Sequence, residues 1–200
     1  QGTPFIYQGE ELGMTNVAWD DINAYQDIET RNMYAQAVSQ KGVPHQEVMQ
    51  SIHAKGRDNA RTPMQWSTAY QAGFTTGTPW LALNNNFAEV NAEQARADAD
   101  SIFHFYRQLI ALRQAWPVLV DGNYSLLLPK HPALFAYTRK LNDVTLLVLC
   151  NFSGQFQGLP LKQLPDFFNA TPLIGNLPKE EWSLAADTLA AWEARVYVLT

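Results

Sequence analysis

Only one run in the first 116 residues has the pattern of a β-strand, and a single strand cannot form a sheet. Thr3–Tyr7 is a short β-branched and aromatic run closed by Gln8-Gly9, which predicts a buried strand rather than a helix. Its backbone N–H and C=O groups need partners from another strand. We therefore interpret the N-terminal part as the end of a larger α/β domain, and we expect the rest of that domain to precede it.

Three segments before residue 117 have the signals of helices. Residues 27–42 and 44–56 are predicted helices, the first with Asp27 as its N-cap. Residues 98–116 are the clearest helix, because apolar residues repeat at spacings of three and four and a proline follows at once. Residues 66–91 are rich in Gly, Thr and Asn without a period, which predicts a long loop that is ordered by its buried aromatic side chains.

The pattern changes after residue 117 to short strand-like runs separated by turn residues. A spacing of about ten residues between such runs is typical of an antiparallel sandwich or barrel. We therefore predict two domains, residues 1–116 and residues 117–200. The strand-like runs are residues 124–128, 133–140, 144–152, 156–161 and 194–200.

The composition excludes several functional classes. The net charge is −5 with no basic block, which argues against a nucleic-acid partner. No apolar run approaches the roughly 18 residues of a membrane-spanning helix, so we expect no membrane partner. The four His residues lack zinc-ligand spacing, and we predict neither a metal nor a cofactor. Cys150, the single cysteine, lies in an apolar run and is interpreted as a buried small hydrophobic residue.

Residues 55–66, with the sequence KGRDNARTPMQW, place three cations and one anion within seven residues, next to an apolar segment. One interpretation is a solvated loop before a core segment, and the other is a pocket that holds a polar ligand. Within this stretch, Asp58 and Asn59 are expected to bond their own backbone in a turn.

Five segments of the chain are distinctive together: GTPFIYQGEELGMTN, DIET, RDNARTPMQW, AGFTTGTPW and WEARVYVL. They resemble the α-amylase superfamily of glycoside hydrolases, in the branch of the oligo-1,6-glucosidases and trehalose-6-phosphate hydrolases. The resemblance implies an α+β fragment. Residues 1–116 would be the C-terminal end of a (β/α)₈ TIM barrel, namely its last strand, a long loop and its last helix. Residues 117–200 would be an all-β antiparallel sandwich domain.

The resemblance implies the C-terminal portion of a retaining, exo-acting α-glucosidase that hydrolyses short α-linked glucosides, with α-1,6 bonds preferred. Its partners would be short α-glucoside oligosaccharides and the N-terminal portion of the barrel, in the cytoplasm. The motifs that carry the catalytic carboxylates in this family do not occur here, so no catalytic residue is assigned and we expect the chain alone to be inactive. The alternatives are a trehalose-6-phosphate hydrolase fragment, a noncatalytic carbohydrate-binding module, or a structural relative without catalysis.

Three residues are substrate-binding candidates by this resemblance. Arg57 would bind hydroxyls of the terminal glucose at the closed end of the pocket, since a guanidinium offers forked donors; the alternative is a brace for its loop. Glu29 would lie near the acceptor-side sugar, or would serve only as an acid favoured by the first turn of its helix. Arg61 is expected to tie the loop to the barrel rim, with direct sugar contact as the alternative.

Two further groups of residues have structural interpretations that we favour. Glu10 and Glu11 are adjacent, and we expect capping and loop bracing rather than acid–base catalysis from them. Aromatic residues of the N-terminal part could stack on sugar rings, but we expect most of them to pack the long loop. These aromatic residues are Trp19, Trp66, Phe74 and Trp80.

Overall fold

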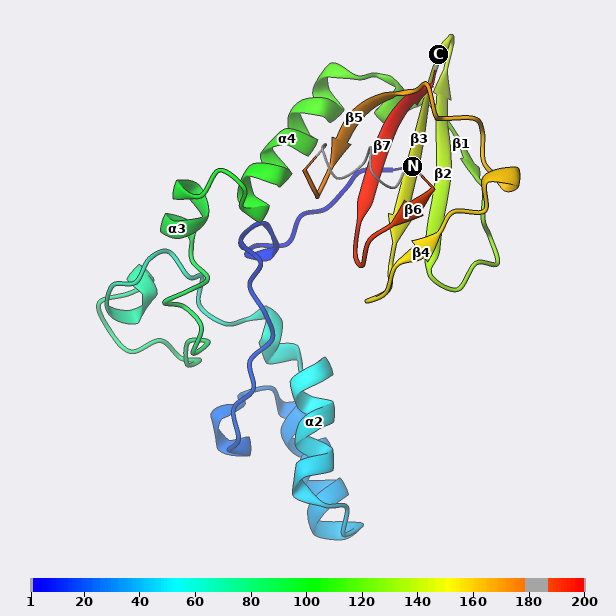
Figure 1. The fold of residues 1–200 in the computed structure, drawn as a ribbon. Coiled ribbons are helices and arrows are strands. Elements are labelled where there is room, and N and C mark those ends of the chain that lie inside the picture. Colours follow the sequence, from blue (N-terminus) through cyan, green and yellow to red (C-terminus); the bar gives the residue numbers. More distant parts are fainter. Residues whose placement is uncertain (1, 179–186, 200) are drawn as a thin grey trace. The chain divides into compact units, whose positions relative to one another are not determined.

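The computed structural model describes residues 2–178 and 187–199 (Figure 1). It divides into two compact units, one formed by Pro4–Arg107 and the other by Gln108–Thr200 with Gln1–Thr3. In sequence the units meet inside the longest helix, α4 (Ile102–Ala115). The domain division at residue 117 stays a prediction.

The first unit consists of helices and loops. The helices predicted at residues 27–42 and 44–56 are confirmed, and the first continues from an α-helix into a π-helical turn. The Asp27 side chain accepts a hydrogen bond from the Thr30 amide, so the predicted N-cap is confirmed. The short helix α3 was not predicted. The elements are η1 (Glu10–Leu12), η2 (Ile22–Ala24), α1 (Ile28–Tyr34), η3 (Ala35–Gln40), α2 (His45–Lys55), η4 (Arg57–Ala60), η5 (Tyr70–Gly73) and α3 (Ala92–Ala97).

The prediction of a buried strand at Thr3–Tyr7 is wrong for this structure. The run pairs with no strand among the described residues, and Phe5 is 92% exposed. The physical reason is that a strand is defined by its ladder of hydrogen bonds to a neighbour. No described segment of the chain supplies that neighbour.

The core of the first unit forms where α2 packs against the loop before α1. Val48, Met49 and Ile52 form the buried stripe of α2, and they contact Val17 and Tyr25. The spacing of these three residues puts them on one face of the helix. Burial of each aliphatic side chain contributes roughly 1.5–3 kcal/mol, so this cluster holds α2 and the loop before α1 together.

The second unit is built on a five-stranded antiparallel sheet in the order β1-β2-β3-β7-β5, with a separate pair of short strands, β4 and β6 (Figure 1). The short helices α5 (Val118–Asp121) and η6 (Leu161–Gln163) lie between strands in the sequence. The strands are β1 (Asn123–Leu126), β2 (Leu134–Leu141), β3 (Val144–Asn151), β4 (Gln157–Gly158), β5 (Thr171–Gly175), β6 (Thr188–Leu189) and β7 (Ala194–Leu199).

The predicted strands agree with the central part of this sheet and differ at its margins. The runs predicted in residues 133–140, 144–152 and 194–200 correspond to β2, β3 and β7, with residue 200 outside the described residues. The run at 156–161 forms only the two-residue strand β4. The edge strand β5 was missed because Pro172 and Gly175 weaken its strand signal, although an edge position tolerates proline.

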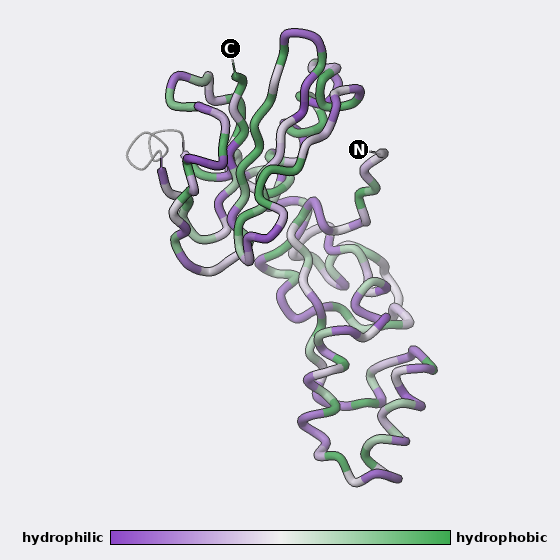
Figure 2. Tube along the Cα trace, turned by 90° about the vertical axis from the view of Figure 1, so that its right-hand side faces the viewer, coloured by the Kyte–Doolittle hydropathy of each residue, from purple (hydrophilic) through white to green (hydrophobic). Residues whose placement is uncertain are grey.

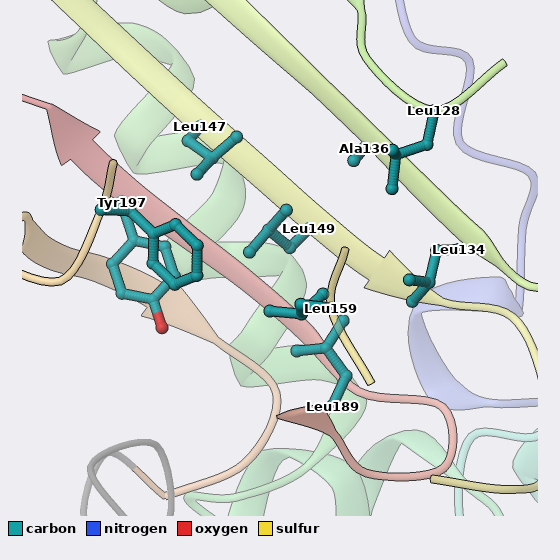
Figure 3. Close-up of a cluster of buried hydrophobic side chains, with 9 residues drawn as sticks. Leu128, Leu134, Ala136, Leu147, Leu149, Leu159, Leu189 and Tyr197 are labelled. Carbon is teal, nitrogen blue, oxygen red and sulfur yellow. The ribbon is translucent and has the colours of Figure 1, made fainter. Parts of the chain in front are cut away.

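The core of the second unit lies on one face of the sheet. Leu134 and Ala136 of β2 point to the same face as Leu147 and Leu149 of β3, where Tyr197 of β7 joins them (Figure 3). This follows from the period of two along a strand. Figure 2 shows hydrophobic stretches, in green, alternating with hydrophilic ones along the chain.

Two smaller features complete the second unit. Cys150 is half-buried, and burial raises the pKa of its thiol to about 11, so the apolar interpretation of this residue holds in part. Glu193 and Arg195 form a buried ion pair beside β7, with exposed fractions of only 1% and 2%. None of the helices in residues 2–178 and 187–199 has the length and apolar character needed to cross a membrane.

Candidate functional site

The charged stretch after α2 folds back onto the start of α1. Gly56 ends α2, and the residues that follow form the tight turn η4. This turn places Arg57 and Arg61 beside two carboxylates that lie some thirty residues earlier, Asp27 and Glu29. The structure therefore brings together all three of the substrate-binding candidates, and it adds Asp27, which the sequence indicated only as a helix cap.

Four ion pairs link these side chains. Arg57 Nη1 lies 3.2 Å from Glu29 Oε2 and 3.9 Å from Asp27 Oδ1. Arg61 Nη1 lies 3.4 Å from the same Asp27 oxygen and 3.5 Å from Asp58 Oδ1. A single oxygen of Asp27, Oδ1, is therefore the partner of both guanidinium groups.

Burial divides the cluster into an inner and an outer part. Asp27 is only 4% exposed and Asp58 is fully buried, whereas Arg57 is 57% and Glu29 is 74% exposed. The backbone amide of Thr30 lowers the pKa of Asp27, and the Thr30 hydroxyl and the two arginines act in the same direction against the effect of burial. The lowered pKa keeps Asp27 ionised, while the outer pair of Arg57 and Glu29 is open to solvent.

The prediction that Asp58 and Asn59 bond their own backbone is wrong. Asp58 Oδ2 accepts hydrogen bonds from the backbone amides of Gln26 (2.7 Å) and Asp27 (2.9 Å). Asn59 Oδ1 accepts one from the amide of Val17 at 3.1 Å. The backbone bonds of η4 already satisfy the turn itself, so these side chains are available to tie it to two earlier loops.

A second feature of this unit is an open cavity of about 380 Å³ with aromatic walls. Trp66, Phe74 and Trp80 line it and are exposed, and Glu11 and Arg61 add polar groups to its wall. The packing prediction therefore does not hold for these three aromatic residues within the described chain. It is confirmed for Trp19, whose ring packs edge-on against Tyr25 at a centroid distance of 5.0 Å.

Glu10 and Glu11 brace the loop that follows the N-terminal run, as expected. Glu11 Oε2 accepts a hydrogen bond from the Gly9 amide at 2.8 Å, and Glu10 Oε1 accepts one from the Tyr106 hydroxyl at 2.7 Å. The bond to Glu10 raises the pKa of Tyr106 to about 12. Both carboxylates have a defined structural partner in the same unit.

The arrangement is suited to binding polar, uncharged groups with several hydroxyls. An exposed guanidinium offers forked N–H donors, and the neighbouring carboxylate accepts hydrogen bonds. Across the described residues, no group of three His, Cys, Asp or Glu side chains is placed to hold a metal ion. The sequence indicates Asp27 as a helix cap, but nothing local in it shows that Asp27 and Asp58 face an arginine.

Comparisons with known proteins agree on one family. The α-amylase family, described as "Alpha amylase, catalytic domain", matches residues 1–122. The chain is 52% identical over 199 residues to an oligo-1,6-glucosidase of Halalkalibacterium halodurans, covering 99% of this chain and 35% of that protein. It is 43% identical to a trehalose-6-phosphate hydrolase of Bacillus subtilis, covering 100% of this chain and 36% of that protein.

A solved structure gives the same answer. The crystal structure of the trehalose-6-phosphate hydrolase of Bacillus licheniformis matches with a TM-score of 0.89 and 42% identity, over 100% of this chain and 36% of that one. The chain thus spans about a third of the length of the relatives it matches. Because the family match covers more than half of its residues, this chain belongs to the α-amylase family.

Proposed function

We propose that this chain is the C-terminal part of a retaining, exo-acting α-glucosidase that hydrolyses short α-linked glucosides, with α-1,6 bonds as the preferred substrates. The observation that carries the proposal is the similarity to an oligo-1,6-glucosidase along 99% of the chain at 52% identity. Retaining hydrolysis requires two carboxyl groups about 5–5.5 Å apart. We place these groups in the part of the protein that precedes this chain.

The same proposal assigns the architecture. Residues 1–116 would be the end of a (β/α)₈ barrel, and residues 117–200 would be a β-sandwich domain. Support for the barrel assignment comes from the family match to residues 1–122. Leu159 and Leu189, next to the two-stranded sheet, share a core with the five-stranded sheet, which supports a two-layer packing.

Arg57, Glu29 and Arg61 have distinct roles in this proposal. Arg57 binds hydroxyls of the terminal glucose, and Glu29 lies near the acceptor-side sugar and helps to select the linkage. Their exposure supports these roles, because both side chains can reach a ligand without breaking the inner part of the cluster. Arg61 is half-buried between two inner carboxylates and ties the turn to α1, with direct sugar contact as the alternative.

The test is an assay of the complete gene product and of the 200-residue chain on matched substrates. Isomaltose, maltose and trehalose 6-phosphate are compared by kcat/KM. We expect the complete protein to favour the α-1,6 disaccharide and the chain alone to release no glucose. Turnover by the chain alone, at a rate that follows its concentration, would contradict the placement of the catalytic groups. A complete protein inactive on all three sugars would contradict the proposed function and favour a noncatalytic binding role.

A second candidate is hydrolysis of a phosphorylated disaccharide. It is favoured by the trehalose-6-phosphate hydrolase of Bacillus subtilis at 43% identity and by the similar structure from Bacillus licheniformis. The same assay separates the two candidates when unphosphorylated trehalose is added as a fourth substrate, because a phosphate site raises kcat/KM for trehalose 6-phosphate above that for trehalose. Equal values for these two sugars would exclude phosphate recognition.

A further inference from the structure

We propose that Asp27 is a positioning residue that holds the guanidinium groups of Arg57 and Arg61 in the orientation needed for sugar binding. The inference rests on the proposed function, and it assigns a role beyond helix capping to the buried side chain of Asp27. Three observations support it. The two oxygens of Asp27 have different partners, its backbone amide is bound by Asp58, and the carboxylates of Asp27 and Asp58 are both buried.

The two carboxylate oxygens of Asp27 have different partners. Oδ2 accepts hydrogen bonds from the amide and the hydroxyl of Thr30, both at 2.9 Å, and thereby caps α1. Oδ1 faces away from the helix toward Arg61 Nη1 at 3.4 Å and Arg57 Nη1 at 3.9 Å. A cap needs only the first oxygen, so the second is available to direct the two arginines.

The backbone that carries Asp27 is fixed by a second buried carboxylate. Asp58 Oδ2 accepts hydrogen bonds from the amides of Gln26 and Asp27, and Asp58 Oδ1 lies 3.5 Å from Arg61 Nη1. Asp58 is part of the turn that also carries both arginines. The position of Asp27 relative to these arginines is therefore set by short contacts at its backbone and at its side chain.

Charge and burial explain why the arginines stay in place. Two carboxylates that are almost completely withdrawn from water require nearby cations, and Arg57 and Arg61 supply the positive charge. Glu29 contacts Arg57 from the solvent side. Arg57 is thus held between a buried anion and an exposed one. A long side chain that is ordered before the ligand arrives loses less conformational freedom on binding.

The test is Asp27→Asn in the complete protein. Asparagine is about as good an N-cap as aspartate, so the variant keeps the cap and removes the charge that faces the arginines. We expect KM for the α-1,6 disaccharide to rise about tenfold, which corresponds to the loss of one charge-assisted contact, with a smaller change in kcat. The matched control is Asp21→Asn, because Asp21 also caps a helix, accepting a hydrogen bond from the Asn23 amide, but is exposed. We expect its kinetics to match the parent protein.

A double-mutant cycle shows whether Asp27 acts through Arg57. In an Arg57→Ala background, Asp27→Asn should change KM less than twofold, because coupled residues are not additive. Equal effects of Asp27→Asn in both backgrounds, or an effect no larger than that of Asp21→Asn, would overturn the inference and leave the role of Arg57 intact. An Arg57→Ala variant with unchanged KM would overturn both. Should Asp27→Asn fail to fold, Asp27→Ser also retains a capping oxygen and takes its place in every arm.

Discussion

The two units of the molecule use arginine–carboxylate pairs in opposite ways. In the helical unit, the ion pair between Arg57 and Glu29 is exposed to solvent, and the neighbouring Asp27 carboxylate is buried. In the strand-rich unit, Glu193 and Arg195 meet inside the fold. An exposed pair adds little to stability and leaves the cation accessible, whereas a buried pair cannot lose one partner without stranding a charge. Under the proposed function, the same pair of residue types serves a ligand in one unit and the fold in the other.

The surroundings of the two pairs support this distinction. Glu193 accepts hydrogen bonds from the Ala190 amide at 2.7 Å and from Arg195 Nη2 at 3.0 Å. Both of its oxygens are occupied within the strand-rich unit. By contrast, Glu29 lies in the first turn of α1 and most of its side chain is open to water. Four experiments test this difference between the exposed pair and the buried pair.

The largest effect is expected from Glu193→Ala. Removal of the Glu193 carboxylate takes the ion-pair partner away from the buried Arg195 guanidinium, which costs about 3–5 kcal/mol in the free energy of unfolding. Urea unfolding followed by the fluorescence of the tryptophans measures it. The comparison fails if this variant unfolds within the experimental error of the parent protein.

The next effect is on binding rather than on stability. Arg57→Ala in the complete protein should lower kcat/KM for the α-1,6 disaccharide by about ten- to a hundredfold, since a charge-assisted contact with the sugar is lost. The melting temperature should change by only a few degrees, because an exposed pair contributes less than about 1 kcal/mol. Arg57→Lys serves as the control, because it keeps the charge but not the forked geometry. A large fall in melting temperature without loss of activity would assign Arg57 to the fold.

The third effect concerns acid pH. The pKa of Asp27 is lowered in the folded protein, mainly by the Thr30 amide, from about 3.9 in an unfolded chain. The stability contributed by this carboxylate is therefore fully present above the unfolded value and is lost as the pH falls through the folded pKa. We expect the stability advantage of the parent protein over Asp27→Asn to shrink below about pH 4. Melting curves recorded from pH 2 to 7 measure it, and parallel curves for the two proteins would contradict the assignment.

The smallest effect is expected from Glu29→Ala on stability. The side chain is mostly exposed, so we expect a loss below about 1 kcal/mol that disappears in high salt. Comparison of the same urea curves with those of Glu193→Ala gives the direct contrast between the two pairs. Similar losses for both variants would show that burial does not separate the two regions.

Local signals in the sequence predicted α2 and the central strands of the sheet. The stripe at Val48, Met49 and Ile52 predicts α2 because three side chains at helical spacing must share a face, and the structure buries all three. The alternation along β2 and the apolar run of β3 likewise predict the centre of the sheet. Strand β5 was not predicted, because it contains a proline that only an edge strand tolerates, and no local pattern in the sequence shows that a strand lies at an edge.

The family, the helix that begins after Asp27 and the central strands were thus determined by the sequence alone, because motifs, caps and periodicity act over a few residues. Two matters were decided only by tertiary structure. The Thr3–Tyr7 run forms no strand in the described residues, because strand identity depends on a neighbour. The cluster around Arg57 exists because η4 and α1 meet across some thirty residues. That meeting depends on hydrogen bonds that distant backbone amides donate to the side chains of Asp58 and Asn59. Contacts of this kind leave no periodic pattern in a sequence.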